Sequence, residues 1–120
     1  MPKPISPRVH SVIDYGFAAG NLLAPSALRL SGRARLLLAG FGVTQGALNA
    51  LTVQPYAIAK QMPFKLHGVL ERNSAPLYFG LPPLLGLARE PRARTYWLVL
   101  GAVLIAVYNL TDWDARPTDQ

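Results

Sequence analysis

Two short motifs carry the residues best suited to chemistry in this chain. His10 and Asp14 are four residues apart, and the same spacing separates His67 from Glu71. These are the only two histidines among the 120 residues. Side chains four residues apart lie on one face of a helix. Imidazole and carboxylate groups placed in this way can bind a metal ion, pass a proton or hydrogen-bond to each other.

The composition indicates that these motifs lie in a membrane protein. Hydrophobic residues make up 51% of the chain and charged residues only 15%, against about a quarter charged in a typical soluble domain. Four nearly uncharged segments approach the roughly 20 residues that cross a bilayer. They are residues 10–30, 36–53, 67–88 and 96–111. We therefore predict an all-α membrane protein with four transmembrane helices, forming a single membrane domain over residues 1–120.

Prolines suggest where the first of these helices begins and ends. Three prolines within Met1–Val9 predict an extended tail before it. Pro25 lies late in the segment and should bend or end the helix. The chain has no cysteine, which excludes disulfides and thiolate metal ligands.

The sequence repeats itself, once from about residue 10 to 53 and again from about 67 to 111. At an offset of 57 residues, His10, Val12, Asp14 and Pro25 align with His67, Val69, Glu71 and Pro82. At an offset of 59, Arg33, Arg35 and Thr52 match Arg92, Arg94 and Thr111. Each copy reads as a helical hairpin. Two tandem hairpins with the same orientation should be related by an axis along the membrane normal.

Duplication predicts one polar cluster near a single membrane face. The two histidines should lie at one depth and the two acids about a turn deeper. Asn49 and Asn109, near the ends of the second and fourth helices, should join them. The candidate binding residues are His10, Asp14, His67, Glu71, Asn49 and Asn109. Ionisable groups inside a membrane are costly and usually face partners in the bundle interior.

Several roles fit this cluster. The leading interpretation is a structural hydrogen-bond network in a non-enzymatic membrane protein, an accessory protein or a subunit of a larger complex, with no cofactor. The alternative is a metal site formed by His10, Asp14, His67 and Glu71. A haem held by the two histidines, or a path for protons or a small solute, would use the same groups. No nucleophile triad or phosphate-binding loop is evident.

The basic residues predict how the protein meets the bilayer. The chain carries a formal charge of +6, but its arginines gather in two short turns rather than in a nucleic-acid-binding module. Arg33, Arg35, Arg92 and Arg94 are expected to contact lipid headgroups. These turns contain little acid, which favours a cytoplasmic location for them and a non-cytoplasmic location for both termini.

The arrangement resembles the small bacterial membrane proteins called SPW-repeat proteins. The matching pieces are His10–Tyr15 and His67–Glu71, Ala24–Ser26 and Pro82–Gly86, and Leu51–Thr52 and Leu110–Thr111. Neither copy keeps the family's tryptophan, and the second acid is Glu71 rather than aspartate. The resemblance implies a four-helix fold in a bacterial inner membrane. It implies no activity, because none is established for that family.

Overall fold

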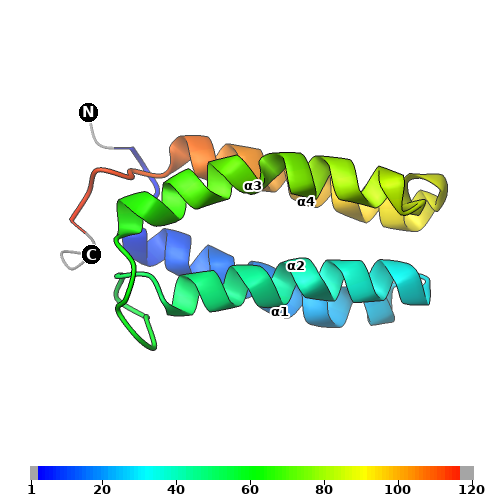
Figure 1. The fold of residues 1–120 in the computed structure, drawn as a ribbon, viewed down its shortest axis with the longest axis horizontal. Coiled ribbons are helices and arrows are strands. Elements are labelled where there is room, and N and C mark those ends of the chain that lie inside the picture. Colours follow the sequence, from blue (N-terminus) through cyan, green and yellow to red (C-terminus); the bar gives the residue numbers. More distant parts are fainter. Residues whose placement is uncertain (1–2, 117–120) are drawn as a thin grey trace.

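The computed structural model describes residues 3–116 and consists of four helices (Figure 1). They are α1 (Pro7–Ala27), α2 (Gly32–Ala50), α3 (Phe64–Leu84) and α4 (Pro91–Leu110), with a 3-10 turn, η1 (Leu87–Arg89), before α4. No strand forms within the described residues, so the all-α, four-helix prediction is confirmed. Residues 1–2 and 117–120, the outer parts of the predicted tails, lie outside this range.

The helices form two stacked hairpins. Figure 1 shows α1 and α2 as one layer and α3 and α4 as the other. Both termini and the long connection between α2 and α3 lie at one end, which we call the terminal end. The two short turns inside the hairpins lie at the opposite end, the turn end. The bundle is 43 Å long.

The helices begin earlier than the sequence predicts. The extended tail was expected to reach Val9, but α1 begins at Pro7. Proline is favoured in the first helical turn, where its missing N–H costs nothing. Ser6 caps this helix by accepting a hydrogen bond from the Val9 N–H at 3.2 Å. The fourth helix likewise begins at Pro91 rather than at Tyr96. The prediction that Pro25 bends or ends the first helix agrees better with the structure, since α1 ends two residues after Pro25.

The two hairpins are packed differently. The α1 and α2 backbones approach closely at Gly42, which has no side chain. A Cβ atom there would lie 2.8 Å from the Asn21 Cβ and 3.0 Å from the Ala18 carbonyl oxygen, both too close for a side chain. Aromatic rings separate α3 from α4 instead, with Tyr78 and Trp97 buried between them. The first interface depends on small residues, as helix contacts in membranes often do.

The interior changes character along the bundle. An apolar cluster including Leu38 and Leu87 fills the turn end. The aromatic cluster of Phe17, Tyr78 and Trp97 follows it. The terminal end is polar, with His10, His67, Asp14 and other polar side chains almost completely buried.

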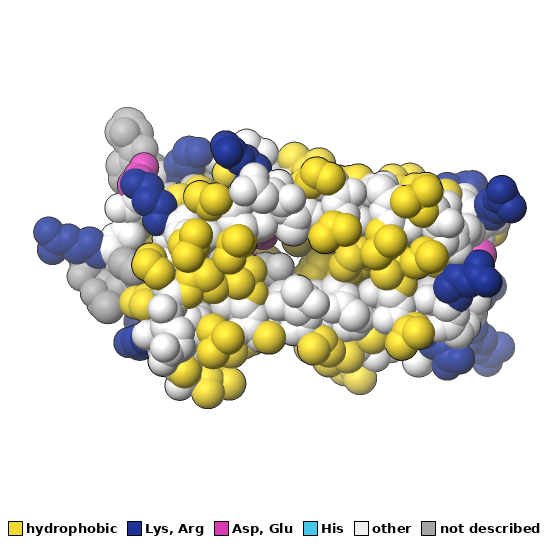
Figure 2. Space-filling model, viewed as in Figure 1, with side chains coloured by type: hydrophobic (Ala, Val, Ile, Leu, Met, Phe, Trp, Pro, Cys, Tyr) yellow, Lys and Arg dark blue, Asp and Glu magenta, His cyan; other side chains and the backbone are white. Residues whose placement is uncertain are grey.

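The outer surface is largely apolar. Large hydrophobic side chains face outward on all four helices, including Leu23 (71% exposed), Leu36 (77%), Leu77 (62%) and Val99 (60%). Figure 2 shows these side chains over the sides of the bundle, with many of the basic residues near its ends. Among the described residues, one helix, α4, is long and apolar enough to cross a membrane.

A candidate metal centre between the two hairpins

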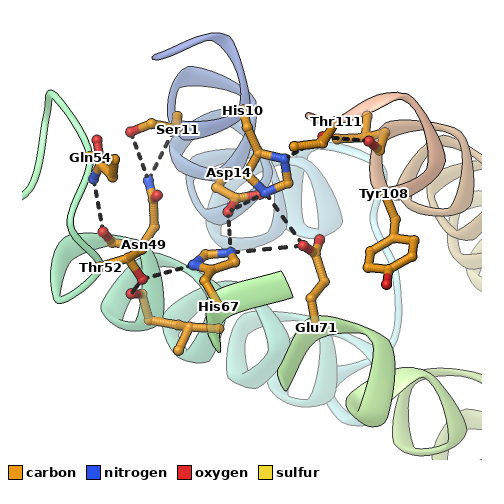
Figure 3. Close-up of polar contacts among 12 residues, drawn as sticks. His10, Ser11, Asp14, Asn49, Thr52, Gln54, His67, Glu71, Tyr108 and Thr111 are labelled. Carbon is orange, nitrogen blue, oxygen red and sulfur yellow. Dashed lines mark hydrogen bonds and ion pairs between the residues drawn. The ribbon is translucent and has the colours of Figure 1, made fainter. Parts of the chain in front are cut away.

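Two helices bring the four predicted motif residues together at the terminal end (Figure 3). The first turns of α1 supply His10 and Asp14, and the first turns of α3 supply His67 and Glu71. We call these four residues the His–acid cluster. Both histidines are fully buried, Asp14 is 1% exposed, and the Glu71 side chain is 11% exposed.

Both imidazoles face both carboxylates. His10 Nε2 lies 3.1 Å from Asp14 Oδ2 and 3.4 Å from Glu71 Oε2. His67 Nε2 lies 3.0 Å from Asp14 Oδ2 and 3.8 Å from Glu71 Oε2. Each acid therefore contacts the histidine of the other hairpin as well as the one on its own helix, so the cluster joins the two hairpins.

Two threonines fix which nitrogen of each ring carries a proton. His67 Nδ1 lies 2.8 Å from Thr52 Oγ1, and His10 Nδ1 lies 2.8 Å from Thr111 Oγ1. Each threonine hydroxyl donates its only proton to a carbonyl of its own helix, at 2.6 Å in both cases. The hydroxyl oxygen is then free only to accept. Each Nδ1 must donate, so a neutral ring would direct the lone pair of Nε2 toward the carboxylates.

This protonation pattern means that the cluster needs positive charge at its centre. Two buried carboxylates facing two imidazole lone pairs would be strongly unfavourable without it. Either two protons on the Nε2 atoms or one divalent cation would balance the two carboxylates. The Nδ1 donors are compatible with both states, and a hydrogen bond on Nδ1 is the usual support for a histidine that binds metal through Nε2.

The geometry of the cluster is compatible with a cation as well as with ion pairs. Among the described residues, neither Nε2 atom and no carboxylate oxygen of Asp14 or Glu71 has a well-oriented hydrogen-bond partner. The distances from Asp14 Oδ2 to the two Nε2 atoms, 3.0 and 3.1 Å, are within the range of N–H···O contacts, whereas those from Glu71 Oε2 are longer, 3.4 and 3.8 Å. Tetrahedral zinc with bonds of about 2.0 Å would place its ligand atoms roughly 3.3 Å apart. Ligand atoms from His10, Asp14 and His67 all lie within 4.8 Å of one another.

A haem does not fit between the two histidines. The Asp14 carboxylate lies 3.1 and 3.0 Å from the two Nε2 atoms, where a porphyrin would have to pass. The ring centroids of His10 and His67 are only 5.3 Å apart and their planes are nearly perpendicular.

Aromatic rings cover the cluster on the side of the terminal end. The indole of Trp113 lies 4.7 Å from the His10 ring and 5.9 Å from the His67 ring, between centroids. The Phe64 ring packs against the indole at 4.9 Å. These rings keep water from the cluster and so strengthen the electrostatic interactions within it.

Asn49 supports the cluster from outside it. Its side-chain amide donates to the Ser11 carbonyl at 2.9 Å, which joins the end of α2 to the start of α1 (Figure 3). The buried Gln54 amide in turn donates to the Asn49 carbonyl at 2.8 Å. Within the described part of the chain, the Asn49 side chain therefore holds the helices in place through Ser11 rather than through the histidines or the acids.

Asn109 was expected in the cluster, but the structure places it outside. It is exposed, and its amide donates to the Ile105 carbonyl of its own helix at 2.8 Å. The reason is one of register. At the 59-residue offset, the counterpart of Asn49 is Tyr108, and one further residue turns the side chain about 100° around the helix.

The threonines are the functional residues that the sequence analysis missed. Thr52 and Thr111 occupy matching places at the ends of α2 and α4 and are both fully buried. Their sequence signal was the repeated Leu-Thr pair, which was used only as a marker of duplication. The two hydroxyls are 15 and 101 residues from the histidines that they contact, so no common spacing would have assigned them.

The arginine turns contact each other as well as the surface. Arg33 donates to the Leu85 carbonyl at 2.9 Å, and Arg92 donates to the Leu28 carbonyl at 3.4 Å. Each hairpin turn thus holds the turn of the other hairpin. Arg94 also donates to the Ala88 carbonyl at 3.2 Å, so three of the four arginines predicted to meet lipid headgroups also make hydrogen bonds within the bundle.

An exposed ion pair lies beside the covering aromatic residues. Lys65 Nζ and Asp114 Oδ1 are 2.9 Å apart on the surface. The hydrogen bond and charge of Lys65 lower the pKa of Asp114 below its usual value. Because both side chains are exposed, this pair contributes little to stability.

Comparison with known proteins found no matching family model, no similar curated protein and no similar solved structure. The resemblance to SPW-repeat proteins stays a prediction.

Proposed function

We propose that this chain is an integral membrane protein that binds one divalent first-row transition metal between its two hairpins. His10, Asp14, His67 and Glu71 would provide the ligands. The observation that carries this proposal is the convergence of two Nε2 atoms and two carboxylates at one buried point, with both Nδ1 atoms committed to threonine hydroxyls. Imidazole and carboxylate ligands in this number suit zinc and its first-row neighbours.

The distribution of side chains supports the membrane part of the proposal. Apolar side chains face outward along all four helices, whereas polar ones such as His10, Asp14 and His67 are buried. A soluble protein rarely exposes so much contiguous apolar surface. The helices have 19 to 21 residues, enough to span about 30 Å of hydrocarbon. We propose that α1, α2 and α3 cross the bilayer together with α4, with the His–acid cluster sheltered inside.

The competing role is structural. Two protonated imidazoles would form ion pairs with the carboxylates and hold the hairpins together in an accessory membrane protein. The cross-hairpin contacts of Asp14 and Glu71 serve that role equally well. The two roles differ in one measurable quantity, the metal content of the purified protein.

The test is elemental analysis of the protein purified in mild detergent, followed by Co²⁺ substitution. We expect one metal ion per chain and, with Co²⁺, the intense visible bands of a tetrahedral site. The double variant His10→Ala/His67→Ala should lose both. Asn109→Ala is the matched control, because it removes an exposed polar group from the same end of the bundle without touching the cluster.

A wild-type protein that takes up neither Zn²⁺ nor Co²⁺ at equimolar concentration would exclude the metal centre. The His–acid cluster would then be a set of ion pairs. Metal that persists in the double histidine variant would place the binding site elsewhere.

A further inference from the structure

The His–acid cluster is buried, so a metal ion can reach it only if part of the protein moves. In the proposed membrane arrangement, the sides of the bundle face hydrocarbon, which an ion does not cross readily. Toward the turn end, the apolar and aromatic clusters fill the interior. The terminal end is therefore the shortest way from water to the two histidines, and its cover controls how a metal ion enters.

The two hairpins are closed differently at the terminal end. Trp113 corresponds to Gln54 at the 59-residue offset, and Gly68 corresponds to Ser11 at the 57-residue offset. In the first hairpin, Gln54 and Ser11 are both hydrogen-bonded to Asn49, at 2.8 and 2.9 Å. In the second hairpin, the Trp113 indole packs directly against the backbone at Gly68, where a Cβ atom would lie only 2.7 Å from it. One side is thus closed by buried hydrogen bonds, and the other by a ring laid on a glycine.

Trp113 belongs to a short segment that follows α4 at the terminal end (Figure 1). We call residues 112–116 the strap; they form neither helix nor strand. The indole N–H donates to the Tyr108 carbonyl at 3.0 Å, and the exposed pair of Lys65 and Asp114 joins the strap to α3 at 2.9 Å. Irregular segments held by exposed contacts open at a lower free energy than packed helices do. The strap is therefore the part of the cover best able to move.

The strap also places negative charge beside the indole. Asp112 and Asp114 flank Trp113 in the sequence. Among residues 3–116, the other acid outside the His–acid cluster is Glu90, which precedes α4 at the turn end. Carboxylates beside an entrance attract cations and raise their local concentration. The charge of the strap therefore suits the passage of a divalent cation.

We propose that the strap is the gate of the metal centre, and that metal ions enter and leave when Trp113 moves away from Gly68. This inference rests on the proposed metal centre and adds a control on its loading. The gate sets how fast the metal exchanges, whereas the four ligands set how tightly it binds. When the strap closes, the indole again excludes water from the cluster.

The first test displaces the indole without altering it. A methyl group at Gly68 is incompatible with the observed position of Trp113, so Gly68→Ala should hold the strap open. Gly80→Ala is the matched control on the same helix, because a Cβ atom there meets nothing within 4 Å. In metal-free protein in mild detergent, we expect the tryptophan emission of Gly68→Ala to shift to longer wavelength as the indole enters water. The emission of Gly80→Ala should not shift.

The second test measures the rates of metal exchange. Stopped-flow absorption follows the uptake of Co²⁺, and addition of EDTA starts its release. Gly68→Ala and Trp113→Ala should each raise both rate constants by about tenfold or more, because opening of the cover limits exchange. The dissociation constant should change less than either rate constant. A ring that only stabilises the bound metal would leave association unchanged and weaken the affinity.

The ion pair gives a milder variant in which the fold is not at risk. Lys65→Gln removes the exposed contact between α3 and the strap, so both rates should rise by about two- to fivefold, as the small free energy of such a pair implies. Lys60→Gln is the matched control, since it removes the same charge from an exposed position in the connection between α2 and α3.

The possible failures give different results. Equal exchange rates in Gly68→Ala and Gly80→Ala, with metal bound by both, would overturn the gate and leave the metal centre in place. A shift in emission without faster association would also overturn it, because the indole would then move without controlling entry. A wild type that takes up neither Zn²⁺ nor Co²⁺ would refute the metal centre and the gate together.

Discussion

Thr52 and Thr111 set the chemistry of the buried histidines through a single hydroxyl each. By donating to the helix and accepting from Nδ1, each threonine leaves Nε2 facing the carboxylates. A side chain of the same shape without a hydroxyl would leave the Nδ1–H buried and unpaired, and the ring would be free to rotate or change tautomer.

We therefore expect Thr52→Val to lower the free energy of unfolding by about 1–3 kcal/mol. If the metal centre is present, the same change should weaken metal binding about 10- to 100-fold. Thermal unfolding in detergent and metal competition with a chelator would measure the two effects. Thr52→Ser, which keeps the hydroxyl, is the control. Unchanged metal affinity in the valine variant would argue against a role for the threonine in orienting His67.

At the scale of the helices, the contact between α1 and α2 depends on a missing side chain. Gly42 lies against Asn21 and Ala18, whereas Gly40, two residues earlier on the same helix, faces open space. The same substitution at these two positions should therefore have opposite effects.

Gly42→Ala should destabilise the protein by about 1–3 kcal/mol, since the new methyl group would force the helices apart. Gly40→Ala should be neutral or stabilise it by up to about 1 kcal/mol, because alanine has the higher helix propensity. The midpoint of thermal unfolding in one detergent would compare them. Equal stabilisation by both would show that helix propensity and not close packing controls these positions.

The helices themselves could be predicted from the sequence, but several details could not. Four apolar runs separated by basic or proline-containing turns are sufficient to give four helices, and the spacing of His10 and Asp14 places them on one face. The start of α1 was missed because proline was treated only as a helix breaker, although Pro7 occupies the first turn. Asn109 was placed one residue out of register. The threonine contacts depend on tertiary packing between hairpins, which no spacing along the chain reveals.

At the scale of the whole molecule, the proposed membrane location predicts an orientation. The arginine-rich turns and the termini lie at opposite ends, so a four-span arrangement places them on opposite sides of the membrane. The charge pattern favours the turns inside and the termini outside. Because the chain has no cysteine, a single introduced cysteine can report the side.

We expect Ile58→Cys, in the connection between α2 and α3, to react with a membrane-impermeant maleimide in intact bacterial cells. Arg35→Cys, in a hairpin turn, should react only after the membrane is permeabilised. Ile58 is 85% exposed, so poor access would not explain a failure to react. The reverse pattern would invert the predicted orientation, and labelling of both positions in intact cells would argue against a four-span arrangement.

The crossed threonine contacts suggest how such a protein arose. His10 in the first hairpin bonds to Thr111 in the second, and His67 in the second bonds to Thr52 in the first. A single hairpin would contain one histidine and one threonine, but in this arrangement each histidine bonds to the threonine of the other hairpin. A single hairpin would therefore complete the cluster only with a second copy across a twofold axis. We infer that the ancestor was a symmetric homodimer whose gene duplicated and fused. Fusion released the halves from identity, which permitted an aspartate in one and a glutamate in the other.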